Sequence, residues 1–181
     1  MTDMATAIMD SAERRMRLGG FGGFSFRDIA ADVGVKSSSV HYHFPTKEAL
    51  TAAVIHRYTD KVSEQLDREI EAGQDSAKVF TRAFRGTLHS GARMCPATVL
   101  GAGALDLPHE VAVEVKRFFK MCLTKMQNSG LSATEASEHL ATITGAMVLS
   151  ISLQDLSAYD RSTGEAAGAA AKVKKKARKK S

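Results

Sequence analysis

The chain has 181 residues, an ordinary apolar content of 44% and a formal net charge of +5, and this length can bury the core of one or two small domains. No apolar run approaches the roughly 18 residues of a membrane span. Residues 1–15 also lack the basic-then-apolar order of a signal peptide, so we expect a cytoplasmic protein. Cys95 and Cys122 are too few for a disulfide framework, and neither lies in a CxxC or Cys/His spacing that would hold zinc.

Residues 24–50, FSFRDIAADVGVKSSSVHYHFPTKEAL, predict two short helices joined by a tight turn and followed at once by a third helix. Ser25 is the expected N-cap of the first, with Asp28 three residues on as a weaker capping-box partner. Apolar residues at 26, 29, 30 and 33 give this helix one buried face, and Gly34 ends it. The pattern is that of a helix-turn-helix, which places one helix in the DNA major groove.

The second short helix of this segment buries Val40 and Phe44, four residues apart. Its outward side chains, which suit base edges and phosphates, are Ser37, Ser38, Ser39, His41, Tyr42 and His43. Pro45 ends the helix and Thr46 caps the next one. Lys47 then lies in a first turn, where the helix dipole disfavours a cation, and a phosphate held at the same helix end would explain it.

These residues allow three other interpretations. Helix-turn-helix patterns also arise by chance in helical proteins, and a run of serines can be a plain surface loop. His41 and His43 could suggest a metal site, but positions two apart do not share a helix face and no third ligand is nearby. We therefore expect no metal site here.

Residues 4–55 resemble the DNA-binding domain of the TetR family of bacterial regulators. The matching pieces are an amphipathic first helix at 5–18, a glycine-aromatic link at 19–24, FRDIAADVGV, the S-V-H-Y-H-F segment and PTKEAL. The resemblance implies an all-α homodimer whose second domain binds a small-molecule effector, which releases a palindromic double-stranded DNA operator.

The resemblance also assigns roles within the segment. Ser25, Arg27 and Lys47 would hold phosphates, and Tyr42 and His43 would lie along the DNA backbone. The residues implied to face the bases are Lys36, Ser37, Ser38, Ser39 and His41. Many family members have a basic residue followed by glycine or alanine where Ser37 and Ser38 stand, and tyrosine at the position of His41. The base preference therefore cannot be copied from a relative.

Apolar periodicity predicts four longer helices after this segment, at 49–70, 75–89, 108–127 and 132–156, with a short or irregular helix within 95–106. In the family that this chain resembles, the last two long helices form a four-helix dimer interface, which implies 108–127 and 134–156 here. A dimer also fits DNA reading, because one helix-turn-helix recognises only a half-site.

An effector pocket in the second domain would be lined by apolar and adaptable side chains, namely Phe80, Phe84, Leu88, Met94, Leu100, Phe118, Cys122 and Met147. Each of these could equally be a core residue. Cys95 precedes a helix expected to start at Pro96 and follows Arg93, a setting that can favour a reactive thiolate. The stretch MCPATVLGA resembles the electrophile-responsive branch of the family, which implies a sensor; the alternative is a small buried cysteine.

The excess of basic over acidic residues comes from the end of the chain. Residues 172–180, KVKKKARKK, hold seven of the 25 lysines and arginines, and the rest of the chain has 18 basic against 20 acidic residues, or −2. The linker RSTGEAAGAAA has no core-forming residues, so we expect 162–181 to be disordered. This tail either adds salt-dependent nucleic-acid affinity or is a solvated segment without function.

These observations predict a DNA-binding domain at 1–48, an effector-binding and dimerisation domain at 49–161 and a tail at 162–181. The expected function is a homodimeric transcriptional regulator, most simply a repressor, released by an effector or by modification of a cysteine. The first rival is a constitutive DNA-binding protein whose second domain only dimerises. The second is an enzyme, but the chain has no nucleophile–base set, paired carboxylates or glycine-rich phosphate loop, so we expect neither catalysis nor a cofactor.

Overall fold

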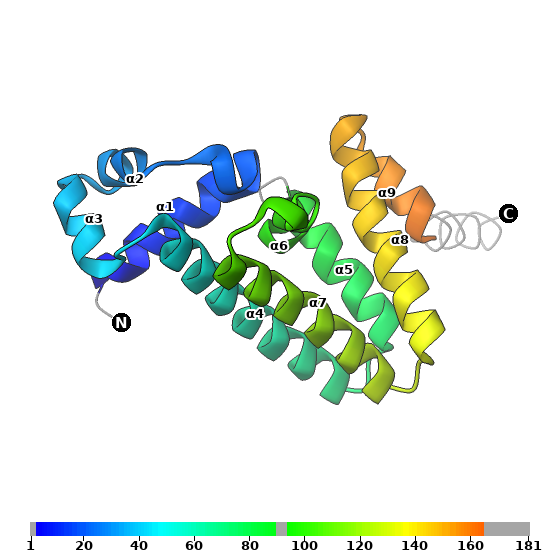
Figure 1. Ribbon diagram of the computed structural model, residues 1–181. Helices are drawn as coiled ribbons and strands as arrows, with labels where there is room; N and C mark the ends of the chain where they lie inside the picture. Colours follow the sequence, from blue (N-terminus) through cyan, green and yellow to red (C-terminus); the bar gives the residue numbers. More distant parts are fainter. Residues whose placement is uncertain (1–2, 90–93, 165–181) are drawn as a thin grey trace, which may run out of the picture.

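The computed structural model describes residues 3–89 and 94–164 (Figure 1). Throughout these two ranges the regular structure is helical, which confirms the predicted all-α class. The elements are α1 (Asp3–Gly19), η1 (Gly20–Gly23), α2 (Phe26–Val33), α3 (Ser37–His43), α4 (Lys47–Glu71), α5 (Ser76–His89), α6 (Pro96–Gly101), η2 (Ala104–Asp106), α7 (His109–Asn128), α8 (Ala133–Ser152) and α9 (Leu156–Thr163). None of the helices in these ranges combines the length and apolar character that crossing a membrane requires.

Two apolar cores lie at the two ends of α4 (Figure 1). The first packs α1, α2 and α3 around the start of α4, and it also includes Leu100 of α6 and Val111 and Val115 of α7. The second fills the space between α4, α5, α7, α8 and α9. The domain boundary expected after residue 48 therefore falls in the first turn of a continuous helix, and α6 and α7 complete the core of the N-terminal unit.

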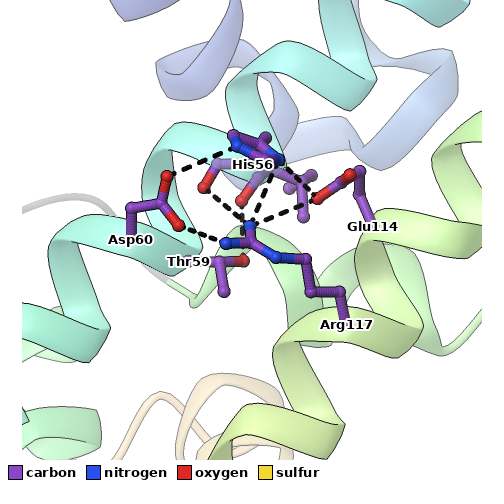
Figure 2. Close-up of polar contacts among 6 residues, drawn as sticks. His56, Thr59, Asp60, Glu114 and Arg117 are labelled. Carbon is purple, nitrogen blue, oxygen red and sulfur yellow. Dashed lines mark hydrogen bonds and ion pairs between the residues drawn. The ribbon is translucent and has the colours of Figure 1, made fainter.

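A polar cluster joins α4 to α7 beside the first core (Figure 2). The His56 ring lies between two carboxylates, with Nδ1 3.1 Å from Glu114 Oε2 and Nε2 3.4 Å from Asp60 Oδ2. Arg117 of α7 donates to Asp60 and pairs with Glu114 at 3.4 Å. The guanidinium thus supplies the positive charge between these acids, and no arrangement of metal-ligating side chains occurs in the described ranges.

The C-terminal helices differ from the prediction in two places. The single helix expected to reach residue 156 ends at Ser152, because Gln154 adopts a left-handed conformation with φ of 52° and Asp155 caps a separate helix, α9. Ser162 and Thr163 belong to α9, so the first two residues of the predicted tail are helical. The buried Tyr159 anchors α9 by donating to the Thr81 carbonyl at 2.8 Å. Residues 165–181, with the rest of the predicted tail, lie outside the described residues.

Candidate functional site

The α2–α3 unit has the local geometry that its sequence indicates. The Ser25 hydroxyl accepts from the Asp28 amide at 3.3 Å and the Asp28 carboxylate accepts from the Ser25 amide at 2.8 Å, which makes a full capping box. Gly34 ends α2 in the left-handed conformation, with φ of 75° and its amide donating to the Ala30 carbonyl. Glycine is the residue that adopts this conformation at least cost, so the turn into α3 depends on it.

Helix α3 presents a polar and aromatic surface. Val40 is its fully buried residue, and Tyr42 is 85% exposed. The predicted contact residues Ser25, Arg27, Lys36, Ser38, His41 and Tyr42 are exposed, whereas Ser37, Ser39, His43 and Lys47 are half-buried. The His41 ring meets the Phe26 ring edge-on, with centroids 4.6 Å apart, so α2 helps to orient this side chain. One short helix therefore displays hydroxyl, imidazole and phenol groups on its outer side.

Lys47 has a local partner that the sequence alone did not indicate. Its Nζ lies 4.7 Å from the Phe21 ring centroid and 4.8 Å from that of Phe24. Two aromatic faces attract the ammonium through their quadrupoles and offset the unfavourable helix dipole. The position of this lysine thus has an explanation without a phosphate, and the two phenylalanines of the glycine-rich link were the signal.

An ion pair ties α1 to α2 behind the recognition surface. Arg15 donates from Nε at 2.7 Å and from Nη2 at 2.8 Å to the two oxygens of Asp32, and the Ser11 hydroxyl donates to Asp32 at 2.6 Å. Hydrogen bonds from Arg15 and then Ser11 hold the pKa of the Asp32 carboxyl well below its usual range. The carboxylate accepts three bonds in its ionised form, which fixes the angle between the two helices.

Comparison with known protein families identifies the segment that contains these helices. Residues 8–54 match the family model described as bacterial regulatory proteins, tetR family. This segment therefore matches the DNA-binding domain of the TetR family. The matched segment runs from within α1 into α4 and contains the helix-turn-helix formed by α2 and α3. No curated protein sequence matches the chain.

Solved structures share the fold over nearly the whole chain. A TetR-family regulator from Agrobacterium tumefaciens is 23% identical with a TM-score of 0.81, covering 89% of this chain and 94% of that one. A TetR regulator from Legionella pneumophila is 24% identical with a TM-score of 0.82, covering 91% and 95%. The reduced form of NemR from E. coli is 15% identical with a TM-score of 0.78, also covering 91% and 95%. At these identities the likeness establishes a common TetR fold.

The side chains expected to line an effector pocket are mostly core residues. Phe80, Phe118, Cys122 and Met147 have no exposed surface in the second core, and burial raises the pKa of the Cys122 thiol. The other four divide between different places. Leu100 packs in the first core, Leu88 lines a separate hollow at the α8–α9 corner, and Met94 packs against the second core. Of these eight residues, Phe84 alone lines the cavity between α1, α4 and α5, because inward periodicity identifies a buried face and does not distinguish a packed core from a hollow.

That cavity lies between α1, α4 and α5, has a volume of about 360 Å³ and opens to solvent. It is lined by Glu13, Arg17, Tyr58, Lys61, Val62, Gln65, Leu66, Glu69, Arg82, Ala83, Phe84, Gly86 and Thr87. Ligand-binding cavities in proteins commonly have volumes of ~300–1,000 Å³, so this one is of ligand size. Arg17 was not predicted as a lining residue, because α1 was assigned to the DNA-binding unit alone.

Arg17 connects this cavity to Cys95. Its guanidinium lies over the Tyr58 ring at 5.2 Å, pairs with Glu13 at 2.7 Å and donates to the Met94 carbonyl at 3.0 Å. Cys95 is 1% exposed at the N-cap of α6, and burial together with contact from this thiol raises the pKa of the Tyr58 hydroxyl. The structure therefore encloses the predicted sensor in the core, which favours the alternative of a buried apolar cysteine.

Proposed function

We propose that this TetR-family protein is a homodimeric repressor that reads a palindromic operator with α3 and leaves it when a small molecule binds its second domain. One observation carries the DNA-binding part of the proposal, namely the exposed hydroxyl, imidazole and phenol groups along a helix held by a capped α2 and a glycine turn. Such groups suit base edges and phosphates.

The proposed contacts keep the roles that the resemblance implies. Lys36, Ser38 and His41 are exposed and would face the bases, with Ser37 and Ser39 half-buried beside them. Tyr42 and His43 would follow the DNA backbone. Arg27 and Ser25, at the start of α2, would hold phosphates. Lys47 would contribute only part of its charge to DNA, because two aromatic rings already hold its ammonium.

The proposed dimer interface uses α8 and α9, whereas the sequence led us to expect α7 and α8. Four large apolar side chains at the end of α8 and the start of α9 are exposed, namely Val148, Leu149, Leu153 and Leu156. The outer side of α7 carries one large exposed apolar residue, Val113, beside exposed Lys116 and Lys120, whose charges a two-fold axis would bring close to their own copies. Like charges in such a contact oppose association. We therefore place the interface on α8 and α9.

The proposed trigger acts where the two units of the chain meet. Arg17 belongs to α1, whose other residues Ser11 and Arg15 hold α2, and the same arginine lines the cavity beside α4 and α5. A ligand in the cavity would contact α1 directly. Release requires that the ligand bind the DNA-free arrangement more tightly than the DNA-bound one.

Modification of Cys95 is the second candidate trigger. The fold shared with reduced NemR and the nearby Arg17 guanidinium support it, whereas the 1% exposure of Cys95 opposes it. A Cys95→Ser variant tests the idea. If an electrophile such as N-ethylmaleimide releases wild type and variant from the operator equally, the thiol is not the sensor.

The experiment that tests the main proposal is selection of bound fragments from the host's genomic DNA with the purified full chain. One or a few inverted repeats with half-sites about one DNA turn apart would support a specific repressor. Unrelated fragments, with binding lost on deletion of residues 165–181, would favour the rival of a constitutive, charge-driven DNA-binding protein.

A further inference from the structure

The cavity between α1, α4 and α5 has an uneven balance of charge. Three cations line it, Arg17, Lys61 and Arg82, against two carboxylates, Glu13 and Glu69. Glu13 is engaged by Arg17 at 2.7 Å and also by Arg57 at 3.2 Å, and Glu69 by Arg82 at 3.2 Å. Both acids are therefore already neutralised.

Lys61 is the cavity-lining cation that neither Glu13 nor Glu69 neutralises. It is exposed on α4 at the cavity mouth, and no carboxylate in residues 3–89 or 94–164 pairs with it. The neighbouring hollow, lined by Asp10, Arg14 and Arg57, shares Glu13, Arg17, Tyr58 and Lys61 with the cavity, so Lys61 stands where the two meet. Asp10 in that hollow is occupied by Arg57 at 2.7 Å. An anion entering from solvent would meet an ammonium that has no competing partner.

The inner wall of the cavity is apolar. Leu66 is fully buried and Phe84 is 3% exposed, and the half-buried Val62 and Ala83 line the cavity with them. A volume of about 360 Å³ corresponds to about a dozen water molecules at ~30 Å³ each. The site therefore has an apolar interior of moderate size below a cationic rim, which suits a ligand with one apolar and one anionic end.

We propose that the cavity binds a hydrophobic carboxylate, with its carboxylate at Lys61 and Arg82 and its hydrocarbon part against Leu66 and Phe84. This rests on the proposed effector-dependent function and names the chemical class of the effector. The carboxylate competes with Glu69 for Arg82, and the ligand also meets Glu13 and Arg17 of α1, which line the same cavity. The ligand thus acts on α1, the helix that carries the α1–α2 ion pair.

Calorimetric titration of the full-length protein with decanoate tests the inference, with decan-1-ol as the neutral ligand and decyltrimethylammonium as the cationic one. Decanoate should bind more tightly than either. Lys61→Gln should weaken decanoate binding about tenfold. Lys78→Gln is the matched control, because Lys78 is exposed on α5 and does not line the cavity. Ala83→Phe, which fills the apolar wall, should abolish binding while Lys61 remains.

The outcomes separate this inference from the proposed function. If decanoate binds no better than decanol, or if Lys61→Gln and Lys78→Gln bind it equally, the carboxylate site is wrong even where the operator is still bound. Binding that survives Ala83→Phe would place the ligand elsewhere and also overturn the inference. If decanoate binds as expected but the protein selects no operator, the site stands and the repressor proposal fails. Circular dichroism verifies that each variant is folded.

Discussion

Leu149 provides the sharpest test of the proposed dimer. It lies on α8 with 50% of its surface exposed, next to Val148 at 46% and one turn before Leu153 at 62%, and Leu156 of α9 is exposed by 42%. Exposed Ala141 and Gly145 precede them on the same helix and would let a partner helix approach closely. Leu149→Asp places a carboxylate at the centre of this surface, and the two-fold axis of a dimer places a second one nearby.

The expected size of the effect follows from these exposures. The four side chains leave about two whole apolar side chains uncovered in each protomer, or about four in a dimer. At ~1.5–3 kcal/mol for each, their burial contributes roughly 6–12 kcal/mol, similar to the ~4–15 kcal/mol that association costs. Losing half a leucine from each protomer removes ~1.5–3 kcal/mol, and the buried carboxylates add to that. The dimer dissociation constant should rise at least ~10- to 100-fold.

Sedimentation velocity over a range of concentrations measures this change. Leu105→Asp is the matched control, since Leu105 is fully exposed in η2, away from α8 and α9. We expect wild type and Leu105→Asp to remain dimeric at concentrations where Leu149→Asp is a folded monomer. A Leu149→Asp dimer as tight as the wild-type dimer would refute the α8–α9 interface, and equal weakening by both substitutions would do the same.

Three further outcomes are expected. Asp32→Asn should cost about 1 kcal/mol of unfolding free energy at pH 7. Because the folded-state pKa of Asp32 is lowered, the stability difference between wild type and variant should fade as the pH drops below ~4. Denaturant titrations that show the same difference at every pH would contradict the role of the ionised carboxylate. Gly34→Ala should destabilise by about 1 kcal/mol through backbone strain alone, since no atom lies within 4 Å of the added Cβ, and thermal unfolding should show no such loss for the helical control Gly86→Ala. Thr46→Ala should cost about 1 kcal/mol, because the Thr46 hydroxyl caps α4 by accepting from the Ala49 amide at 3.0 Å, and Thr46→Ser should recover most of it in the same assay.

Local sequence signals were sufficient to predict the helix-turn-helix. Ser25, Gly34 and Thr46 act through their own backbone neighbours, so their residue types indicate the ends of α2 and the start of α4 without tertiary information. The capping box formed by Ser132 and Glu135 at the start of α8 is a signal of the same local kind.

Features that depend on tertiary contacts could not be predicted in this way. The break between α8 and α9 falls at Gln154, a residue without the signature of glycine or proline, and the burial of Tyr159 against α5 stabilises it. The cavity draws its walls from three helices far apart in sequence, and Arg17 enters it from a helix whose pattern indicates only its contact with α2 and α3. Periodicity assigned Phe80 and Phe118 to the interior, but only the packing of the neighbouring helices shows that no hollow reaches them.

The central claim is that α3 reads DNA sequence, and the most direct measurement is a ratio of affinities. Binding to the selected inverted repeat and to a scrambled duplex would be titrated by fluorescence anisotropy at several salt concentrations. Removing two base-facing groups in Ser38→Ala/His41→Ala should lower the scrambled-to-operator ratio of dissociation constants by about tenfold or more, since a good base contact contributes ~1–3 kcal/mol of discrimination. Arg27→Gln should weaken both duplexes alike and reduce the salt slope by about 1. A ratio unchanged in Ser38→Ala/His41→Ala would contradict the account, because specificity would then arise outside α3.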